Sequence, residues 1–306
     1  MSITAMKLCS MILQENFGDV VRTVGDDLFC TKSRTIYEII KKTNLSRKQV
    51  TSSLAILTQY RLVSYSSIEN NEQIAEYMLH YDKILLFLRY PRYMYFIQKK
   101  KGDLGALLLE ELLRSGMAIA HSVIIQAYAN TDVKNDQTLI ELRDTFIDMV
   151  GEKFFIRCPE MSDDPVPKIL NEKNGNFQVS NIEIKEIKQL IDSNKDPENV
   201  VSEKVYWTVN FDKLHQCFRD KVLIDAIERQ IDANAAECFQ FIISLMYKTT
   251  EAWEPVSNAI SIGEIKRVIE KKSNNTELLR HLEQYVSIIE KDECGFLKKD
   301  ETGNAV

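Results

Sequence analysis

Residues 46–66 read SRKQVTSSLAILTQYRLVSYS, and this stretch decides the fold of the first part of the chain. Ser46 and Gln49 have the spacing of a capping box, in which the serine hydroxyl and the glutamine side chain satisfy backbone amides at the start of a helix. The pattern therefore predicts a helix over residues 46–60. Its inward face is predicted by the apolar residues that recur at helical spacing, namely Val50, Leu54 and Leu57.

The residues around this helix complete a small domain. Residues 4–17 and 35–42 place apolar side chains at helical spacing, so each predicts a helix that precedes the capped one. After the capped helix, residues 62–66 alternate as in a strand, and residues 74–78 predict a returning strand beyond a polar turn. Two helices, a capped helix and a two-stranded wing form a winged-helix domain, a variant of the helix-turn-helix.

The same order of helix and strand occurs twice more along the chain. Residues 138–150 predict a helix that leads into a β-like run at 154–157, and residues 275–289 predict one that leads into 295–298. We therefore predict a mainly α fold of tandem extended winged-helix (helix-turn-helix) domains, each with a small two- or three-stranded wing.

A change of composition divides these domains. Four of the six prolines lie between residues 159 and 197, in a stretch that is poor in aromatic residues and net negative, which is typical of a linker. The predicted organisation is a first winged helix, a second winged helix, an acidic linker that contains proline, and a third winged helix. The corresponding residues are 1–82, 83–158, 159–200 and 201–306.

The charge balance limits the possible partners. The 306 residues include 45 Asp and Glu against 39 Lys and Arg, a net charge of −6. Non-specific binding to nucleic acid depends on clustered cations that neutralise phosphates, so any DNA contact must be local. No stretch approaches the roughly 18 uncharged apolar residues of a membrane span, and the first residues do not resemble a secretory signal. We expect a protein that acts inside the cell.

Sequence patterns of catalysis and metal binding are absent. The six cysteines are scattered and the four histidines are unpaired, so neither a disulfide framework nor a metal site is indicated. The ten glycines form neither of the common phosphate-binding motifs, and GxSxG does not occur. We expect no catalytic residue, no metal and no cofactor.

The capped helix carries the first candidate site. Arg47 and Lys48 lie on its polar face with small hydroxyl side chains, and this helix usually reads the major groove in DNA-binding winged helices. We therefore take these two cations as candidate DNA contacts. Many winged helices dock proteins instead, and a polar helix face is most often simply solvated.

Residues 83–101 form a second candidate site, since they hold six basic residues and no acidic one, interleaved with aromatic residues. Arginine and tyrosine are enriched in interface hot spots, and such mixtures also bind nucleic acid. A third interpretation is that the aromatic stripe faces the core of the second domain. The candidate protein-interface residues are Arg89, Tyr90, Arg92 and Tyr93. The further candidates for DNA contact are Lys99, Lys100 and Lys101.

Several stretches in this chain resemble a known family, and they occur in the family's order. The resemblance is to the winged-helix subunit of the RNA polymerase III-specific three-subunit subcomplex, and it covers essentially the whole chain. Its most specific parts are LRYPRY (residues 88–93) and NFDKLHQCFRD (residues 210–220), which lie within the longer similar stretches LLFLRYPRY and VYWTVNFDKLHQCFRD. The others are KLCSMILQENFG, LVSYS, ELLRSG, FIRCP and ISIGEIKRVIEK.

The resemblance implies a nuclear, non-catalytic subunit that sits on the polymerase clamp. It implies as partners a second winged-helix subunit and an acidic-tailed subunit of the subcomplex, with promoter DNA as a further candidate, and a role in promoter opening and initiation at genes for small untranslated RNAs. The alternative is a free-standing DNA-binding winged-helix regulator. Such a regulator must supply its own phosphate contacts, yet residues 83–158, the most basic region, hold 11 basic against 9 acidic residues.

The end of the chain carries one further expectation. Family members continue into a fourth winged helix and a coiled coil, so the resemblance implies a C-terminally shortened chain whose third wing is incomplete. We therefore expect a wing strand at residues 296–298 and partial exposure of Phe296 and Leu297.

Overall fold

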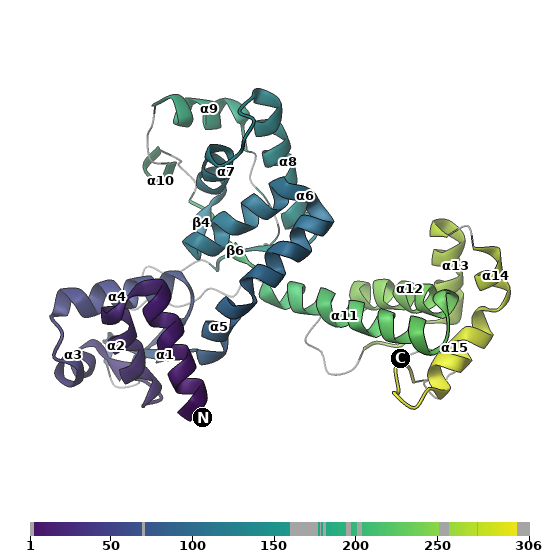
Figure 1. Ribbon diagram of the computed structural model, residues 1–306, viewed down its shortest axis with the longest axis horizontal. Helices are drawn as coiled ribbons and strands as arrows, with labels where there is room; N and C mark the ends of the chain where they lie inside the picture. The colour runs from purple at the N-terminus through teal and green to yellow at the C-terminus, as the bar shows by residue number, and fades with distance from the viewer. Residues whose placement is uncertain are drawn as a thin grey trace. The chain divides into compact units, whose positions relative to one another are not determined.

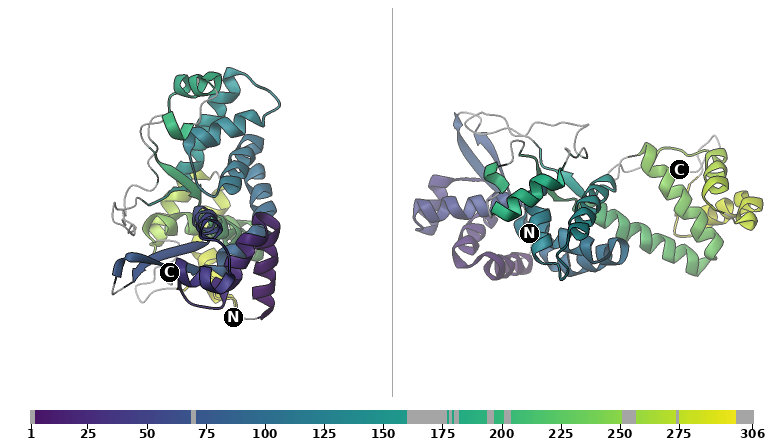
Figure 2. Two further views of the ribbon diagram at one scale, coloured as in Figure 1. Left: turned by 90° about the vertical axis from the view of Figure 1, so that its left-hand side faces the viewer. Right: turned by 90° about the horizontal axis from the view of Figure 1, so that it is seen from above.

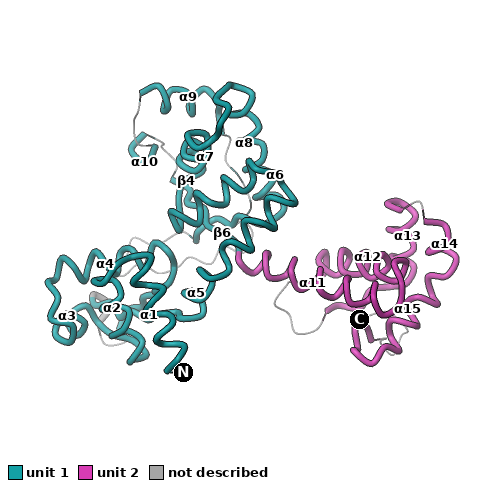
Figure 3. The backbone as a smooth tube through the Cα atoms, in the orientation of Figure 1, with its two compact units in different colours: residues 1–210 teal, residues 211–306 magenta. Residues whose placement is uncertain are grey.

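The computed structural model describes residues 3–68, 71–159, 177, 179, 182–193, 197–200, 204–250, 257–273 and 275–298 (Figure 1). The chain forms two compact units, residues 1–210 and 211–306 (Figure 3). The predicted fold class is confirmed, because the described residues are mainly helical and their two three-stranded sheets are small and antiparallel.

The first domain is a winged helix whose sheet has the order β1-β3-β2. The predicted helix at 46–60 and the predicted hairpin are confirmed, and Figure 2 shows the hairpin standing out from the helices. The elements are α1 (Ile3–Phe17), α2 (Asp19–Phe29), β1 (Arg34–Thr35), α3 (Ile36–Thr43), α4 (Arg47–Gln59), β2 (Val63–Ile68) and β3 (Asn71–Leu79).

Helix α2 is an element that the sequence analysis did not predict. Gly18, with a φ of 86°, separates it from α1, and its buried valines and leucine continue the core. Gly25 lets the two helices approach closely, since a Cβ there would lie 2.4 Å from Cδ1 of Leu13. The first domain therefore has one more core helix than the pattern indicated.

The second domain closes around a sheet of order β4-β6-β5. The start of the basic-aromatic segment still packs on the first domain, because Ile84 is part of the core of that domain. A positive φ of 75° at Gly102 interrupts the long first helix of the second domain. The predicted helix at 138–150 and the strand at 154–157 are confirmed. The elements that connect the two domains are α5 (Tyr81–Leu85), which packs against α1, and the 3-10 helix η1 (Leu86–Arg89). The elements of the second domain are α6 (Tyr90–Ser115), β4 (Ala118–Ile119), α7 (Ala120–Ala129), α8 (Asp136–Gly151), β5 (Phe155–Arg157) and β6 (Tyr206–Val209).

The domain boundaries differ from the predicted ones. Strand β6 pairs with both β4 and β5, so it belongs to the second domain although it lies beyond the predicted linker. Two helices inside that linker, α9 (Ile184–Ser193) and α10 (Pro197–Val200), lie against α7 of the same domain. The second domain therefore extends to residue 210, because its sheet needs a strand that the sequence pattern assigned to the third domain. Residues 160–176, which carry two of the linker prolines, lie outside the described residues.

The first two domains meet at a junction where the end of α6 contacts the end of α4. The Tyr60 hydroxyl donates a hydrogen bond to the Arg114 carbonyl, and Nε2 of Gln59 donates one of 2.9 Å to the Ser115 carbonyl. The last carbonyls of a helix have no partner within it, so these side chains satisfy them. Gly116 follows with a φ of 74°, and a Cβ there would lie 2.9 Å from the Gln59 carbonyl oxygen.

The regular elements of the second unit are helices in the described residues, apart from a single β-bridge residue, Ile260. The helix predicted at 276–289 is present in two pieces that meet at His281. Its elements are α11 (Phe211–Gln230), α12 (Ala233–Thr249), α13 (Ile262–Lys272), α14 (Thr276–Arg280) and α15 (Leu282–Lys291).

The expected third wing is not present in the described residues. Residues 295–298 are not a strand, so the strand predicted there is wrong. Leu297 is 5% exposed and belongs to the core of the unit, and Phe296 is half-buried with its ring edge-on to Phe239 at 6.1 Å. The expected exposure of Leu297 is therefore also wrong, because this segment packs as coil against α12. None of the described helices has both the length and the apolar character needed to span a bilayer.

Candidate interaction surfaces

Local capping fixes the helix-turn-helix of the first domain. The Thr35 hydroxyl caps α3, and the Glu38 carboxylate accepts a 2.9 Å hydrogen bond from the Thr35 amide. The hydrogen bonds that Glu38 accepts from the Thr35 amide and the Thr35 hydroxyl hold the pKa of Glu38 below its usual range. Asn44 ends α3 in the left-handed conformation, with a φ of 55°. Ser46 and Gln49 then form the predicted capping box of α4. The turn between the helices is thus specified residue by residue.

Cations surround this turn. Arg47 and Lys48 are exposed at the start of α4, and neither forms an ion pair with a described residue. Lys41 and Lys42 are exposed at the end of α3. Tyr37 lies one residue off the buried face of α3, and 76% of it is exposed. We call the surface formed by these five residues the α3–α4 face.

A pocket of about 340 Å³ lies between α4 and the wing of the first domain. Its walls are mainly apolar and include Leu54, Ala55, Tyr65 and Tyr77, and Met117 of the second domain closes one side. Two tyrosines beside aliphatic side chains suit a protein partner better than phosphate, since no cation lines this pocket.

The basic-aromatic segment divides into a buried and an exposed part. Tyr93 is completely buried, and burial also raises the pKa of Tyr90, whose ring stacks on Phe87 with centroids 4.7 Å apart. Arg89 and Arg92 are exposed. The two tyrosines therefore pack within the first unit, as the core-facing interpretation expects. The arginines are the exposed interface candidates, although Arg89 also donates a hydrogen bond to Tyr93.

The three lysines of the same segment differ from one another. Nζ of Lys99 lies 5.6 Å from the ring centre of the exposed Tyr95. Lys100 forms a 2.6 Å ion pair with Glu152, and Lys101 pairs with both Asp148 and Glu152. Two of the three candidate DNA-contact lysines are thus held by carboxylates at the end of α8.

The most specific family-like stretch supplies a polar cluster in the second unit. The Tyr247 hydroxyl donates to the Asp220 carboxylate at 2.6 Å, and Nη2 of Arg219 donates to the same hydroxyl oxygen at 2.7 Å. Burial and the Asp220 carboxylate raise the pKa of Tyr247. Nζ of Lys213 lies 5.1 Å from the ring centre of Tyr247. These contacts fasten α11 to α12, so the signature residues here have a structural explanation.

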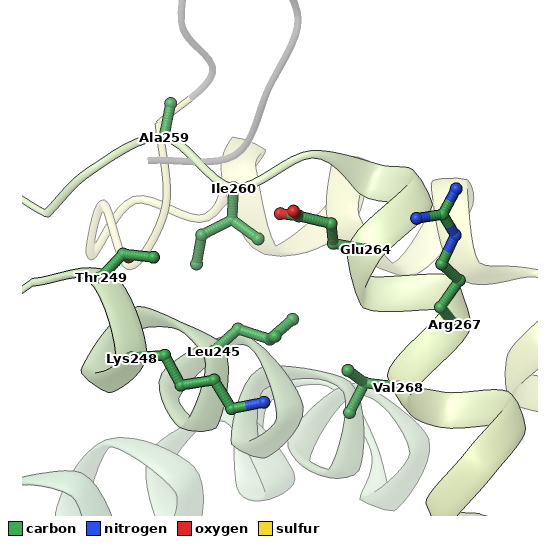
Figure 4. Close-up of a pocket in the computed structure, with 8 residues that line it drawn as sticks. All are labelled: Leu245, Lys248, Thr249, Ala259, Ile260, Glu264, Arg267 and Val268. Carbon is green, nitrogen blue, oxygen red and sulfur yellow. The ribbon is translucent and has the colours of Figure 1, made fainter.

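A second pocket lies between α12 and α13 of the second unit (Figure 4). Leu245, Ile260 and Val268 line it, while Lys248 and Arg267 stand at its edge with Glu264. Across the described residues, no group of three or more side chains could hold a metal ion. The apolar walls of the two pockets suit binding.

Residues 144–304 match the family model described as RNA polymerase III subunit RPC82, and residues 7–67 match the model of the helix-turn-helix domain of that subunit. The chain belongs to this family. The RPC82-family assignment agrees with the curated relatives, which include DNA-directed RNA polymerase III subunit RPC3 of Homo sapiens (29% identical over 333 residues) and of Danio rerio (26% over 332 residues). These alignments cover 98% of the chain but 61% of each relative, so the chain spans about three fifths of their length.

The sequence analysis of this RPC82-family chain did not single out Tyr37, Lys41 and Lys42 of the α3–α4 face. Tyr37 was overlooked because TIYEIIKK was examined only for its buried isoleucines. The signal was available, since an aromatic residue one position after Ile36 cannot share the face of Ile36 and Ile39. The pairing of Lys100 and Lys101 with α8 had no such signal, because it joins residues about 50 positions apart.

Proposed function

We propose that this chain acts as a non-catalytic subunit of DNA-directed RNA polymerase III, within the specific subcomplex that assists promoter opening and initiation at genes for small untranslated RNAs. The observation that carries the proposal is the match of RPC82 family models to both ends of the chain, at residues 7–67 and 144–304. The names of the relatives support it, since each is called an RNA polymerase III subunit. The chain would act in the nucleus.

We propose as partners the polymerase clamp, the second winged-helix subunit and the acidic subunit of the subcomplex. Two structural features support docking to protein. The pocket between α4 and the wing has tyrosine and aliphatic walls, and Arg89 and Arg92 are exposed beside the start of α6. Exposed arginines are frequent anchors of protein interfaces.

Co-purification tests this proposal. A tagged chain expressed in cells of its source organism should co-purify with RNA polymerase III subunits. The double variant Arg89→Ala with Arg92→Ala should lower that recovery, while its melting curve by circular dichroism should change little. Lys32→Ala with Lys134→Ala removes two exposed cations of the same unit elsewhere and serves as the matched control. Recovery of no polymerase subunit by the unchanged chain would contradict the function. A melt lowered by several degrees would assign the two arginines to packing.

Direct DNA contact is the second candidate function, and only Arg47 and Lys48 support it fully. Both are exposed, whereas Lys100 and Lys101 must break ion pairs before they can meet a phosphate, and Lys99 adds a single cation. Fluorescence anisotropy of the 306-residue chain with duplex DNA across a salt series tests this. Each genuine phosphate contact changes the salt slope by about one unit. Absence of binding at low salt removes the DNA role.

A further inference from the structure

Each of the first two domains has a short strand that is followed by an equivalent pair of helices, α3 and α4 in the first domain and α7 and α8 in the second. β1 leads directly into α3, and β4 leads directly into α7, so the second residues of these helices, Tyr37 and His121, are equivalent. α4 and α8 each begin directly after a residue whose side chain caps the helix. Their first residues, Arg47 and Asp136, are therefore equivalent as well.

In the second domain a helix of the same chain covers this pair. α9 lies against both α7 and α8 (Figure 1). Oε2 of Glu186 is 3.6 Å from Nε2 of His121, which is only 8% exposed, and Nζ of Lys188 is 2.7 Å from Oδ2 of Asp136. α9 is amphipathic, and its buried residues are Ile187 and Leu190.

In the first domain the equivalent pair is bare among the described residues. Ile39 is the one buried residue of α3, and Tyr37, at the position of the covered His121, stands 76% exposed. By contrast α7 buries half of its length. Its buried residues are Ala120, His121, Val123, Ile124 and Ala127.

The charge at the equivalent positions is reversed. Where Asp136 receives Lys188 of α9, the first domain has Arg47, and Lys48 follows it. Lys41 and Lys42 add two more cations at the end of α3, and the one acid of that helix, Glu38, is engaged in its capping box. A helix that docks here as α9 docks on the second domain would have to bring acidic residues to the place of Lys188.

We propose that the α3–α4 face of the first domain binds an acidic amphipathic helix of another protein, in the way that α9 covers α7 and α8. The bound helix presents two apolar residues three positions apart to α3 and α4. An Asp or Glu one position after the first of them meets Arg47, and the polypeptide covers Tyr37. This inference goes beyond the proposed function and does not depend on membership of a polymerase.

The alternative occupant of a basic helix-turn-helix is DNA, and two observations favour a helix. The second copy of this surface in the same chain is covered by protein, through one apolar contact zone, the Lys188–Asp136 ion pair and the contact of Glu186 with His121. The first copy offers a largely exposed tyrosine on the helix that carries Lys41 and Lys42, and a ring of this size contributes contact area to a protein partner at low entropic cost.

The probe is an acidic peptide made from α9, with both of its lysines replaced by glutamate. It comprises residues 182–193 with Lys185→Glu and Lys188→Glu, and a lactam bridge keeps it helical because so short a helix is marginal in water. Fluorescence anisotropy measures its affinity for the 306-residue chain. Its own second-domain site should reject it, since Glu at position 188 would face Asp136.

We expect the acidic peptide to bind the unchanged chain and to lose about tenfold or more in affinity when Arg47→Glu and Lys48→Glu are introduced together. The peptide with the native lysines should then bind this variant more tightly than it binds the unchanged chain. Lys32→Glu with Lys134→Glu makes the same change of net charge elsewhere and should leave both affinities unchanged. Tyr37→Ala should weaken binding, whereas Tyr95→Ala, at another largely exposed tyrosine, should not.

Two results would overturn the proposal. In the first, the acidic peptide binds no more tightly than a scrambled peptide of the same composition and bridge. In the second, a short duplex DNA binds at the same salt concentration and loses affinity in the Arg47 and Lys48 variant while the peptide does not, which would assign the face to nucleic acid.

Discussion

The wings of the first two domains have the same three-stranded form but are closed in different ways. In the first domain β2 and β3 are neighbours in sequence, and their hairpin completes the sheet within residues 63–79. In the second domain β5 pairs with β6, and residues 158–205 lie between these two strands in the sequence. Closing the short loop of the first hairpin costs little conformational entropy. The sheet of the second domain instead pairs strands that are separated by a long stretch of chain, and closing that loop costs more. The second domain should therefore depend on one strand to a degree that the first does not.

Trp207→Ala tests this dependence and should have the largest effect. Trp207 lies on β6, is 2% exposed and packs edge-on against Phe146 with ring centres 5.9 Å apart. Truncation of a buried aromatic side chain costs about 3–5 kcal/mol. Hydrogen exchange monitored during unfolding by urea should show that the loss of stability is concentrated in α6, α7 and α8. Tyr65→Ala, on β2 of the first domain, is the comparison and should cost less, and equal losses would refute the asymmetry.

Gly116→Ala should have the next largest effect, because the residue combines a φ of 74° with a close approach to the first domain. A Cβ would lie 2.9 Å from the Gln59 carbonyl oxygen, and a left-handed alanine adds backbone strain, together about 1–3 kcal/mol. Calorimetry should then show the two domains melting less cooperatively. Gly151→Ala is the matched control, since nothing lies within 4 Å of its Cβ position. A loss as large at Gly151 would show that the junction is not the cause.

Acid should affect the two domains in opposite directions. Burial opposes the ionisation of Glu152, but hydrogen bonds from Lys100 and Lys101 hold the pKa of Glu152 below its usual range. Glu152 therefore stabilises the folded state at pH values above its pKa in the unfolded chain, and this stabilisation is lost as the pH falls through its pKa in the folded chain. In the first domain burial raises the pKa of Asp27, and Arg34 offsets this only in part. Its protonation therefore favours the folded state as the pH falls.

The change in stability between neutral and mildly acidic pH should be small, about 1 kcal/mol or less, because Glu152 is partly exposed and solvent screens its ion pairs. Hydrogen exchange between neutral and mildly acidic pH measures it, with α8 expected to lose protection and α2 to gain it. Glu152→Gln should abolish the loss in α8, and Asp27→Asn should abolish the gain in α2. Parallel loss in both domains of the unchanged chain would contradict the assigned shifts.

Lys48→Glu should have the smallest effect, and its sign is the informative part. The first turn of α4 carries two cations and no acid, which opposes the helix dipole, whereas α8 has Asp136 at the corresponding place. Replacement by Glu should raise the melting temperature slightly, corresponding to about 0.3–1 kcal/mol. Gln137→Glu at the matching position of α8 controls for helix propensity and should add less. A lower melting temperature for Lys48→Glu would mean that the cation serves the fold.

Local signals were sufficient to predict most of the first domain. The Ser46 capping box and the isoleucines of α3 each act within one or two helical turns, so their structural consequence is contained in the same stretch of sequence. Helix α2 was missed because Gly18 interrupts a run that otherwise continues α1.

The remaining errors share a physical cause, since each concerns contacts between distant residues. Strand β6 was assigned to the third domain because its partners at Ala118 and Phe155 cannot be seen from its own four residues. The wing strand expected at 296–298 failed because Leu297 satisfies its apolar character by packing on helices instead. Tyr93 was a candidate interface residue since a tyrosine beside arginines has the same composition whether its ring faces solvent or core.

The junction of the first two domains decides how this molecule can be divided for study. A fragment that ended at residue 82 would keep the Gln59 and Tyr60 side chains but discard the carbonyls that they cap, and would bare the aromatic rings of Phe17 and Tyr60 that pack near Phe87. A fragment that ended at residue 158 would remove β6 and leave β4 and β5 without the strand that joins them. Recombinant work on the first two winged helices should therefore use residues 1–210 as its smallest piece.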